Sequence, residues 1–236
     1  MAKMLQAKIN AIQGLGKVSR EHCNDGLLPF SNAFPDGVFP VGTIHECISY
    51  EPAEAASTTA FITAITGKLM KESGLVLWIG NDRKIFPPGL NHFGLTPDRI
   101  VFITVSKTKE ALWAIEEALK CEALTCVVGE IKELGFTDSR RLQLAVERSG
   151  VTGFIHRYRP FAENTVACTT RWRITPITSA FNGMLSGVGH SCWDVQLLKV
   201  KNGRPNSWKV RWSGDGFLSL EEQHRSIPFI HERTAG

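Results

Sequence analysis

Between residues 43 and 156, short apolar runs alternate with longer segments of helical periodicity, and this alternation constrains the fold more than any other feature. The apolar runs cover residues 43–49, 75–79, 99–105, 125–131 and 152–156. Apolar residues recur three and four positions apart, as in amphipathic helices, in segments 54–70, 107–124 and 137–149. Strands that alternate with helices form βαβ crossovers and a mainly parallel sheet with helices on both faces. We therefore predict an α/β domain.

After residue 160 only β-strand patterns remain, in segments 167–176, 193–201 and 207–212. The last two segments are joined through Asn202-Gly203, a pair that tolerates the positive φ of tight hairpin turns. These patterns predict an antiparallel extension of the sheet. We divide the chain into an N-terminal helix and linker (1–26), a core domain (27–217) and a C-terminal tail (218–236).

Composition narrows the class of protein. No run of about 18 uncharged apolar residues occurs, and residues 1–17 carry lysines without the apolar stretch of a secretion signal. We therefore expect a cytoplasmic protein with no membrane contact. The six cysteines never form Cys-x-x-Cys and no histidine pair has zinc-ligand spacing, so we predict no metal site. A net charge of +4 over 236 residues does not indicate nucleic-acid binding, which only local clusters could support.

Several segments, taken in their order along the chain, resemble known families. Residues 42–48 follow a Gly/Pro-rich loop, precede a predicted helix, and resemble the strand that leads into the phosphate loop of RecA. A closer resemblance, to the ImuA proteins, is carried by residues 125–130, by Ser139-Arg140-Arg141-Leu142, and by residues 153–160 and 170–174. The similarity covers roughly residues 27–217, and it depends on the order of these segments rather than on one motif.

The resemblance implies both a fold and a role. The implied fold is a RecA-like sheet of the P-loop NTPase type with flanking helices, an antiparallel C-terminal extension and a degenerate phosphate loop. ImuA proteins accompany the Y-family-related protein ImuB and a second C-family polymerase in damage-induced mutagenic repair. The expected function is therefore that of an accessory protein in translesion synthesis that binds an ImuB-like protein, with RecA and the error-prone polymerase as further partners.

The segment where a phosphate loop belongs lacks the residues that bind phosphate. A P-loop needs glycines to wrap the phosphates, a lysine to neutralise them and a hydroxyl to hold Mg²⁺. Residues 49–59 contain neither glycine nor lysine, and Glu51 and Glu54 add negative charge beside the helix N-terminus. The hydroxyls of Ser57, Thr58 and Thr59 remain, but these residues are better explained as small polar residues in the first turn of a helix. We expect no nucleotide cofactor and no catalysis.

The other RecA-type catalytic positions also diverge. The metal-positioning aspartate corresponds to Gly129, and the adjacent Glu130 could serve only after a shift of one residue, which reverses the face of a strand side chain. The resemblance places the water-activating carboxylate near Asp82. The segments that correspond to the DNA-binding loops of RecA, 132–137 and 161–167, are short, so we predict no filament on single-stranded DNA and at most weak DNA contact.

Alternating cations mark two candidate contact surfaces. Arg157 with Arg159 and Arg171 with Arg173 suggest either a nucleic-acid contact or a solvated face of an edge strand. On the predicted hairpin, Lys199 and Lys201 share one face, as do Lys209 and Arg211 on the next strand. In RecA, hairpin lysines reach a neighbouring subunit's nucleotide. Lys201 resembles the first of these lysines, whereas Gly203 occupies the position of the second.

Two further segments are candidates for partner binding. An apolar stripe of Leu5, Ile9 and Ile12 in the N-terminal helix could dock on a neighbouring protein, including a second copy of this chain, or fold back on its own core. The tail from 218 to 230 carries too many apolar residues for a freely solvated end.

Two other functional classes stay open. A SulA-like cell-division inhibitor that binds FtsZ is one, because Val127-Val128-Gly129 and Gly153-Phe154-Ile155 resemble that protein too. A working RecA-like ATPase is the other, and residues 49–59 argue against it.

Overall fold

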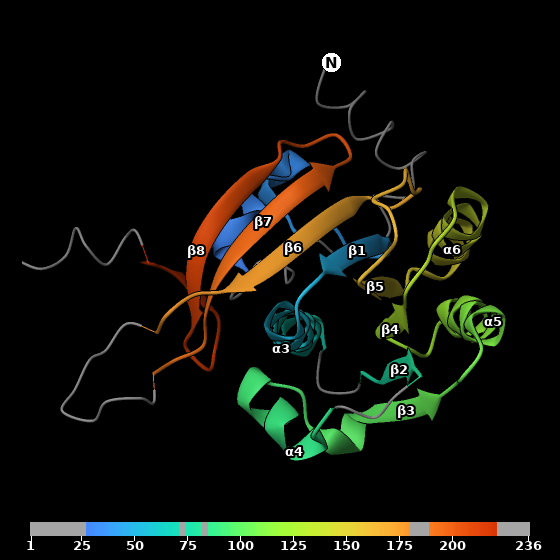
Figure 1. Ribbon diagram of the computed structural model, residues 1–236, viewed down its shortest axis with the longest axis horizontal. Helices are drawn as coiled ribbons and strands as arrows, with labels where there is room; N and C mark the ends of the chain where they lie inside the picture. Colours follow the sequence, from blue (N-terminus) through green and yellow to red (C-terminus); the bar gives the residue numbers. More distant parts are fainter. Residues whose placement is uncertain (1–26, 71–73, 82–84, 180–188, 221–236) are drawn as a thin grey trace, which may run out of the picture.

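A nine-stranded mixed sheet organises the part of the chain that the computed structural model describes, residues 27–70, 74–81, 85–179 and 189–220 (Figure 1). The strands lie in the order β3-β2-β4-β5-β1-β6-β7-β8-β9. Their bounds are β1 (Ile44–Ser49), β2 (Val76–Gly80), β3 (Ile100–Thr104), β4 (Cys126–Ile131), β5 (Thr152–Tyr158), β6 (Thr170–Pro176), β7 (Cys192–Val200), β8 (Asn206–Trp212) and β9 (Phe217–Ser219). The predicted α/β class is confirmed.

Strand β1 lies between β5 and β6 and runs parallel to both. His45, for example, is in register with Phe154 on one side and with Thr170 on the other. From β6 onward the sheet is antiparallel, as the hairpin pattern predicted, and Asn202 has the positive φ of 59° that the turn requires. The short strand β9 was not predicted. It includes Leu218, which the sequence analysis assigned to the tail.

Three long helices cover the parallel strands. Figure 1 shows α3 (Pro52–Leu69) on one side, and α5 (Thr108–Leu119) with α6 (Phe136–Ser149) on the other. Helix α5 ends five residues earlier than predicted, because residues 120–125 turn the chain back into β4. Each face has its own apolar core: Cys47, Phe61 and Phe154 belong to the α3 side, and Ile44, Ile115 and Ile155 to the α5–α6 side.

Aromatic side chains join the antiparallel extension to the rest of the core. Phe30 of the short helix α2 (Leu28–Ser31) contacts Phe61, Trp172, Trp208 and Phe217 edge to face, with ring centroids 4.9 to 5.9 Å apart. The remaining short elements are α4 (Pro87–Leu90) and the 3-10 turns η2 (Pro35–Gly37), η3 (Asn91–Phe93) and η4 (Pro97–Arg99). Within the described residues, none of the helices combines the length and apolar character that a membrane crossing requires.

Candidate functional site

The N-terminus of α3 holds a carboxylate of the protein itself. Glu54 is buried in the first turn, and its Oε2 accepts a hydrogen bond of 2.8 Å from the backbone N–H of Tyr50. Its Oε1 accepts a hydrogen bond of 2.8 Å from the guanidinium of Arg173, which comes from β6. Helix N-termini after a β-strand are where P-loop proteins bind phosphate. Glu54 therefore places a carboxylate at a helix N-terminus that follows a β-strand.

The environment keeps Glu54 ionised. Burial alone raises the pKa of this carboxyl, but the backbone N–H of Tyr50 and the guanidinium of Arg173 stabilise the charged form more strongly, so the pKa lies below its usual value. Arg173 therefore has a charged partner and is not a free cation at the sheet edge.

The three hydroxyl residues that the sequence analysis assigned to a degenerate phosphate loop lie further along α3. Ser57 and Thr58 are buried and Thr59 is half-buried. The hydroxyl of Thr58 has no hydrogen-bond partner within the described part of the chain, and the backbone carbonyl of Thr59 accepts a hydrogen bond from Thr63. Their burial fits small polar residues packed within a helix.

The second degenerate motif divides between the two faces of the sheet. A side chain at Gly129 would meet α5, because a Cβ there would lie 2.3 Å from Cδ1 of Ile115. The next residue, Glu130, points to the α3 face, where its Oε1 accepts a hydrogen bond of 2.9 Å from the indole N–H of Trp78. Glu130 and Trp78 line a cleft of about 550 Å³ next to β3. Asp82, the third candidate acid, lies outside the described residues.

A buried ion cluster connects β1, β5 and β6. Both carboxylate oxygens of Glu46 are used: Oε1 accepts a hydrogen bond of 2.8 Å from Arg157, and Oε2 one of 2.6 Å from Arg171. Glu46 and Arg157 are fully buried. The guanidinium of Arg157 also donates to Asn164 Oδ1 at 3.0 Å and to Glu133 Oε2 at 3.3 Å. We call Glu46, Glu133, Arg157, Asn164 and Arg171 the buried arginine cluster.

The buried arginine cluster ties together the two loops that follow β4 and β5. Glu133 accepts a hydrogen bond of 2.7 Å from the backbone N–H of Phe161, and the amide of Asn164 donates to the carbonyl of Leu134 at 2.8 Å. Lys199 on β7 donates to the carbonyl of Val166 at 2.8 Å. Both loops are thus attached to the sheet and to each other, in the region where the sequence analysis expected truncated DNA-binding loops.

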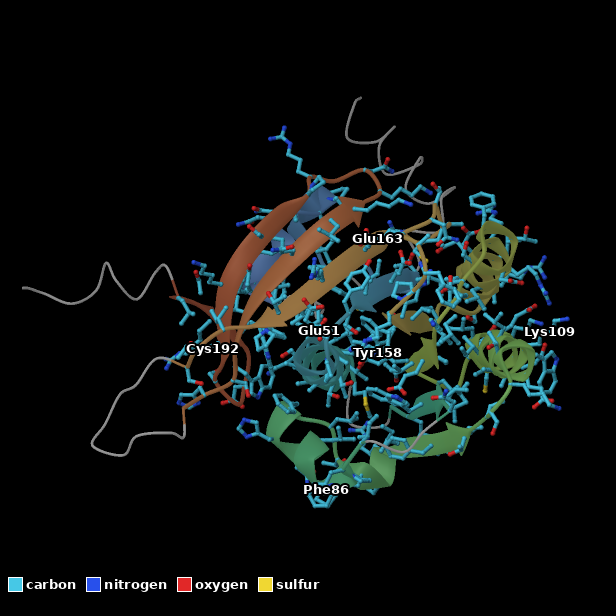
Figure 2. The ribbon with its side chains drawn as sticks, in the orientation of Figure 1. Glu51, Phe86, Lys109, Tyr158, Glu163 and Cys192 are labelled. Atoms are coloured by element: carbon cyan, nitrogen blue, oxygen red, sulfur yellow. The ribbon has the colours of Figure 1, made fainter. Side chains whose placement is uncertain are left out.

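The interpretation of Arg157, Arg159, Arg171 and Arg173 as a solvated edge-strand face is wrong. Strands β5 and β6 are both interior strands, and Arg157 has no exposed surface. Each of the four arginines lies beside a glutamate, because carboxylates from β1, from the start of α3 and from the β4–α6 loop face them. Arg159 is the most exposed, with its guanidinium 3.7 Å from Glu51 and bonded to the carbonyl of Tyr50 at 2.7 Å. Figure 2 labels Glu51, Tyr158 and Glu163 near the carboxyl ends of β1 and β5.

Two buried histidines, His45 and His156, were not among the site residues predicted from the sequence. His45 stacks between Phe39 and Phe154, and its Nε2 lies 2.9 Å from the carbonyl oxygen of Pro40. His156 is bonded to the hydroxyl of Ser49 at 2.7 Å. Burial lowers the pKa of His45 to about 3 and that of His156 to about 4, so both are neutral near pH 7. Only their positions within apolar runs hinted at this role.

The remaining candidates fall into two groups. Lys199 and Lys201 lie at the end of β7, with Lys201 exposed. Leu5, Ile9 and Ile12 lie outside the described residues. No group of three or more His, Cys, Asp or Glu side chains among the described residues has the arrangement of a metal site.

Comparison with known proteins identifies relatives of this chain. No family model matches the chain. The Protein ImuA of Caulobacter vibrioides is 31% identical over 187 residues in each of two strains, NA1000 / CB15N and CB 15, which is 74% of this chain and 77% of the relative. The Cell division inhibitor SulA of Photorhabdus laumondii is 27% identical over 124 residues, or 51% of this chain and 70% of the relative. The identity to ImuA extends over most of both proteins, and the chain therefore belongs to the ImuA family.

Proposed function

We propose that this protein is a non-catalytic accessory factor of damage-induced mutagenic DNA repair, and that it acts by binding an ImuB-like protein. Membership in the ImuA family supports the pathway. The non-catalytic assignment depends on the Glu54 carboxylate at the start of α3. This carboxylate accepts hydrogen bonds from Arg173 and from the backbone N–H of Tyr50.

A nucleotide phosphate would have to compete with that carboxylate. It would lie next to an ionised Glu54 without a phosphate-loop lysine to offset the repulsion. Restoring an aspartate at position 129 would in addition drive its side chain into Ile115. Both features oppose phosphoryl transfer, which needs a metal and a cation on the same phosphates.

The tied loops present a surface suited to a protein partner. The side chain of Phe161 is 81% exposed, and that of Phe136, at the start of α6, is 57% exposed. The ammonium of Lys132 lies 3.7 Å from the centroid of the Phe161 ring. Exposed aromatic residues on a rigid support are typical of interaction hot spots, because little conformational entropy is lost on binding. We assign the ImuB-like partner to this surface.

Partner binding is tested with a double substitution and a matched control. Full-length protein with Phe136→Ser and Phe161→Ser should bind the ImuB-like protein at least about 30-fold more weakly, because hot-spot residues contribute about 2 kcal/mol or more. The control is Phe86→Ser, a 72% exposed phenylalanine next to α4 that should leave affinity unchanged. Unchanged binding by the double variant would refute the assignment of this surface.

Nucleotide binding is tested separately by calorimetry. We expect no heat of binding for ATP with Mg²⁺ at micromolar protein concentration. A micromolar dissociation constant, about −8 kcal/mol, would overturn the non-catalytic proposal.

A second function is supported by the SulA relative. Under that alternative the protein would bind FtsZ and inhibit cell division. Binding of purified FtsZ, together with no affinity for the ImuB-like protein, would favour it over the first proposal. Binding of RecA or of the C-family polymerase is to be measured in the same assay as an extension of the mutagenesis proposal.

A further inference from the structure

The antiparallel extension has one apolar face and one basic face. Trp193, Val195 and Leu197 of β7 are buried on the α2 side, as are Val210 and Trp212 of β8. Side chains alternate along a strand, so the intervening residues face the other way. On β8 these are Lys209 and Arg211. On β7 the pairing with β6 shifts by one residue, so that Trp172 pairs with Leu197 but Arg171 pairs with Lys199, and this shift turns Lys199 to the same opposite face. Lys201 follows Val200, which packs on the apolar side, and it is exposed. We call Lys199, Lys201, Lys209 and Arg211 the basic sheet face. Figure 1 shows α2 on one side of β7 and β8.

The charges of the basic sheet face have no carboxylate partners in the described part of the chain. Arg171 and Arg173 of the adjacent β6 pair with Glu46 and Glu54, but none of the four cations forms a salt bridge there. Lys199 donates to a neutral carbonyl, which leaves its charge uncompensated. Nε of Arg211 is shielded from water and has no hydrogen-bond partner among the described residues.

Only one acidic residue lies on strands β6, β7 and β8. This residue is Asp194, which is in register with Lys209 and accepts a hydrogen bond of 3.2 Å from the amide of Gln196. The face therefore carries a net positive charge. The ligand that best complements it is an anion with several charges in a row.

The composition of the basic sheet face distinguishes between classes of partner. Centres of protein–protein interfaces are depleted in lysine and enriched in aromatic residues. This face has three lysines, and its exposed apolar residues are Leu198 and, on the neighbouring β9, Leu218. The strongly exposed aromatic residues Phe86, Trp113, Phe136 and Phe161 lie on other elements. Lysine-rich surfaces without aromatic residues fit a phosphate backbone better than a protein surface.

The spacing of the cations fits the same ligand. Lys209 and Arg211 are two residues apart on one strand, so their Cα atoms are separated by about 6.8 Å. This distance is comparable to the separation of successive phosphates along a nucleic-acid strand. Unpaired bases are usually bound by stacking on aromatic side chains, which this face lacks.

We propose that the basic sheet face binds the phosphate backbone of duplex DNA. The contact is independent of base sequence, because contacts to phosphates carry no sequence information directly. It uses different residues from the Phe136 and Phe161 surface, so the protein can hold DNA and its protein partner at the same time.

The test measures binding of the full chain to labelled duplexes of two unrelated sequences, as a function of salt. Both duplexes should bind equally. The salt slope is the change of the logarithm of the binding constant with the logarithm of the salt concentration. In the triple variant Lys201→Gln, Lys209→Gln and Arg211→Gln its magnitude should be smaller by about 2.7, because each phosphate contact contributes about 0.9 on duplex DNA. Lys199 is left intact because it anchors Val166.

A matched control removes the same charge elsewhere. The variant Lys109→Gln, Arg140→Gln and Arg148→Gln neutralises three exposed cations of α5 and α6 and should retain the full slope. Equal weakening by both variants would show that net charge alone drives binding, and it would overturn the proposal. Tighter binding to single-stranded DNA than to duplex DNA would also overturn it. So would binding of an acidic protein segment with no binding of duplex DNA. If the full chain binds the ImuB-like protein but no duplex DNA, the DNA-binding proposal fails and the proposed function is unaffected.

Discussion

The arginines of β5 and β6 and the cations of the β7–β8 hairpin have the same pattern in the sequence but opposite surroundings in the structure. Both sets alternate along a strand. Arg157, Arg171 and Arg173 bind carboxylates that lie 111, 125 and 119 positions away along the chain. The hairpin cations bind none in the described part of the chain. Local spacing therefore determines which face a charge occupies, whereas long-range packing determines whether that charge is available to a ligand.

The largest expected effect is in the buried arginine cluster. Glu46→Gln should lower the free energy of unfolding by about 3–5 kcal/mol, because it leaves Arg171 without a charged partner and leaves the buried Arg157 with only the partly exposed Glu133. Urea denaturation measures the change. Glu133→Gln is the control and should cost much less, because the Glu133 side chain is 39% exposed. A loss below about 1 kcal/mol for Glu46→Gln would show that the cluster is not important for stability.

Buried bases without a carboxylate should behave differently from the paired arginines. Below pH 6.5 the unfolded chain protonates His156, whereas the folded protein keeps it neutral down to a pKa of about 4. As the pH is lowered across this window, the free energy of unfolding therefore decreases by about 1.4 kcal/mol per pH unit for each such histidine. His156→Gln should make the slope shallower by that amount in thermal or urea unfolding between these pH values. An unchanged slope would mean that His156 is protonated in the folded protein.

The carboxylate at the start of α3 should make stability depend on pH, whereas an acid whose pKa does not change on folding would not. The pKa of Glu54 is lowered on folding, so its contribution is complete above the unfolded value of about 4.3 and is lost as pH falls below it. Glu54→Gln should cost about 1–2 kcal/mol at neutral pH, where a hydrogen-bonded charge is replaced. The difference from wild type should shrink below about pH 4. A constant difference at all pH values would argue against the ion pair with Arg173.

The smallest effect is expected on the hairpin. Lys201→Gln and Lys209→Gln should each change the free energy of unfolding by less than about 0.5 kcal/mol, because neither side chain has a partner to lose in the described structure. Urea unfolding followed by circular dichroism measures these changes in the free energy of unfolding. A loss comparable to that of Glu46→Gln would remove the contrast between the two sets of cations.

The sequence was sufficient for the order of the elements but not for the contacts of the functional residues. Apolar runs and helical periodicity predicted eight of the nine described strands and the three long helices, because both signals are local. Strand β9 has only three residues, too few for a period to be read. The partners of Arg157 could not be predicted, since Glu46 sits in an apolar run and nothing local indicates that β1 lies beside β5.

The degenerate motifs show the same limit. The absent glycine and lysine and the negative charge of Glu51 and Glu54 were visible in residues 49–59, but the pairing of Glu54 with Arg173 was not. The reason for a glycine at position 129 depends on Ile115, a residue of a different element, which packs against it. Residue types show which motif residues are missing, whereas only the packing shows which contacts the residues present make.

The central position of β1 has a consequence for synthesis of the protein on the ribosome. The strand is made early, yet both of its neighbours, β5 and β6, are made more than a hundred residues later, as the pairing of Ile44 with Gly153 shows. Until residue 158 has left the exit tunnel, the apolar side chains of β1 and the charge of Glu46 lack their native surroundings. Nascent chains that stop before β5 should therefore depend on chaperones, and those that include β6 should not.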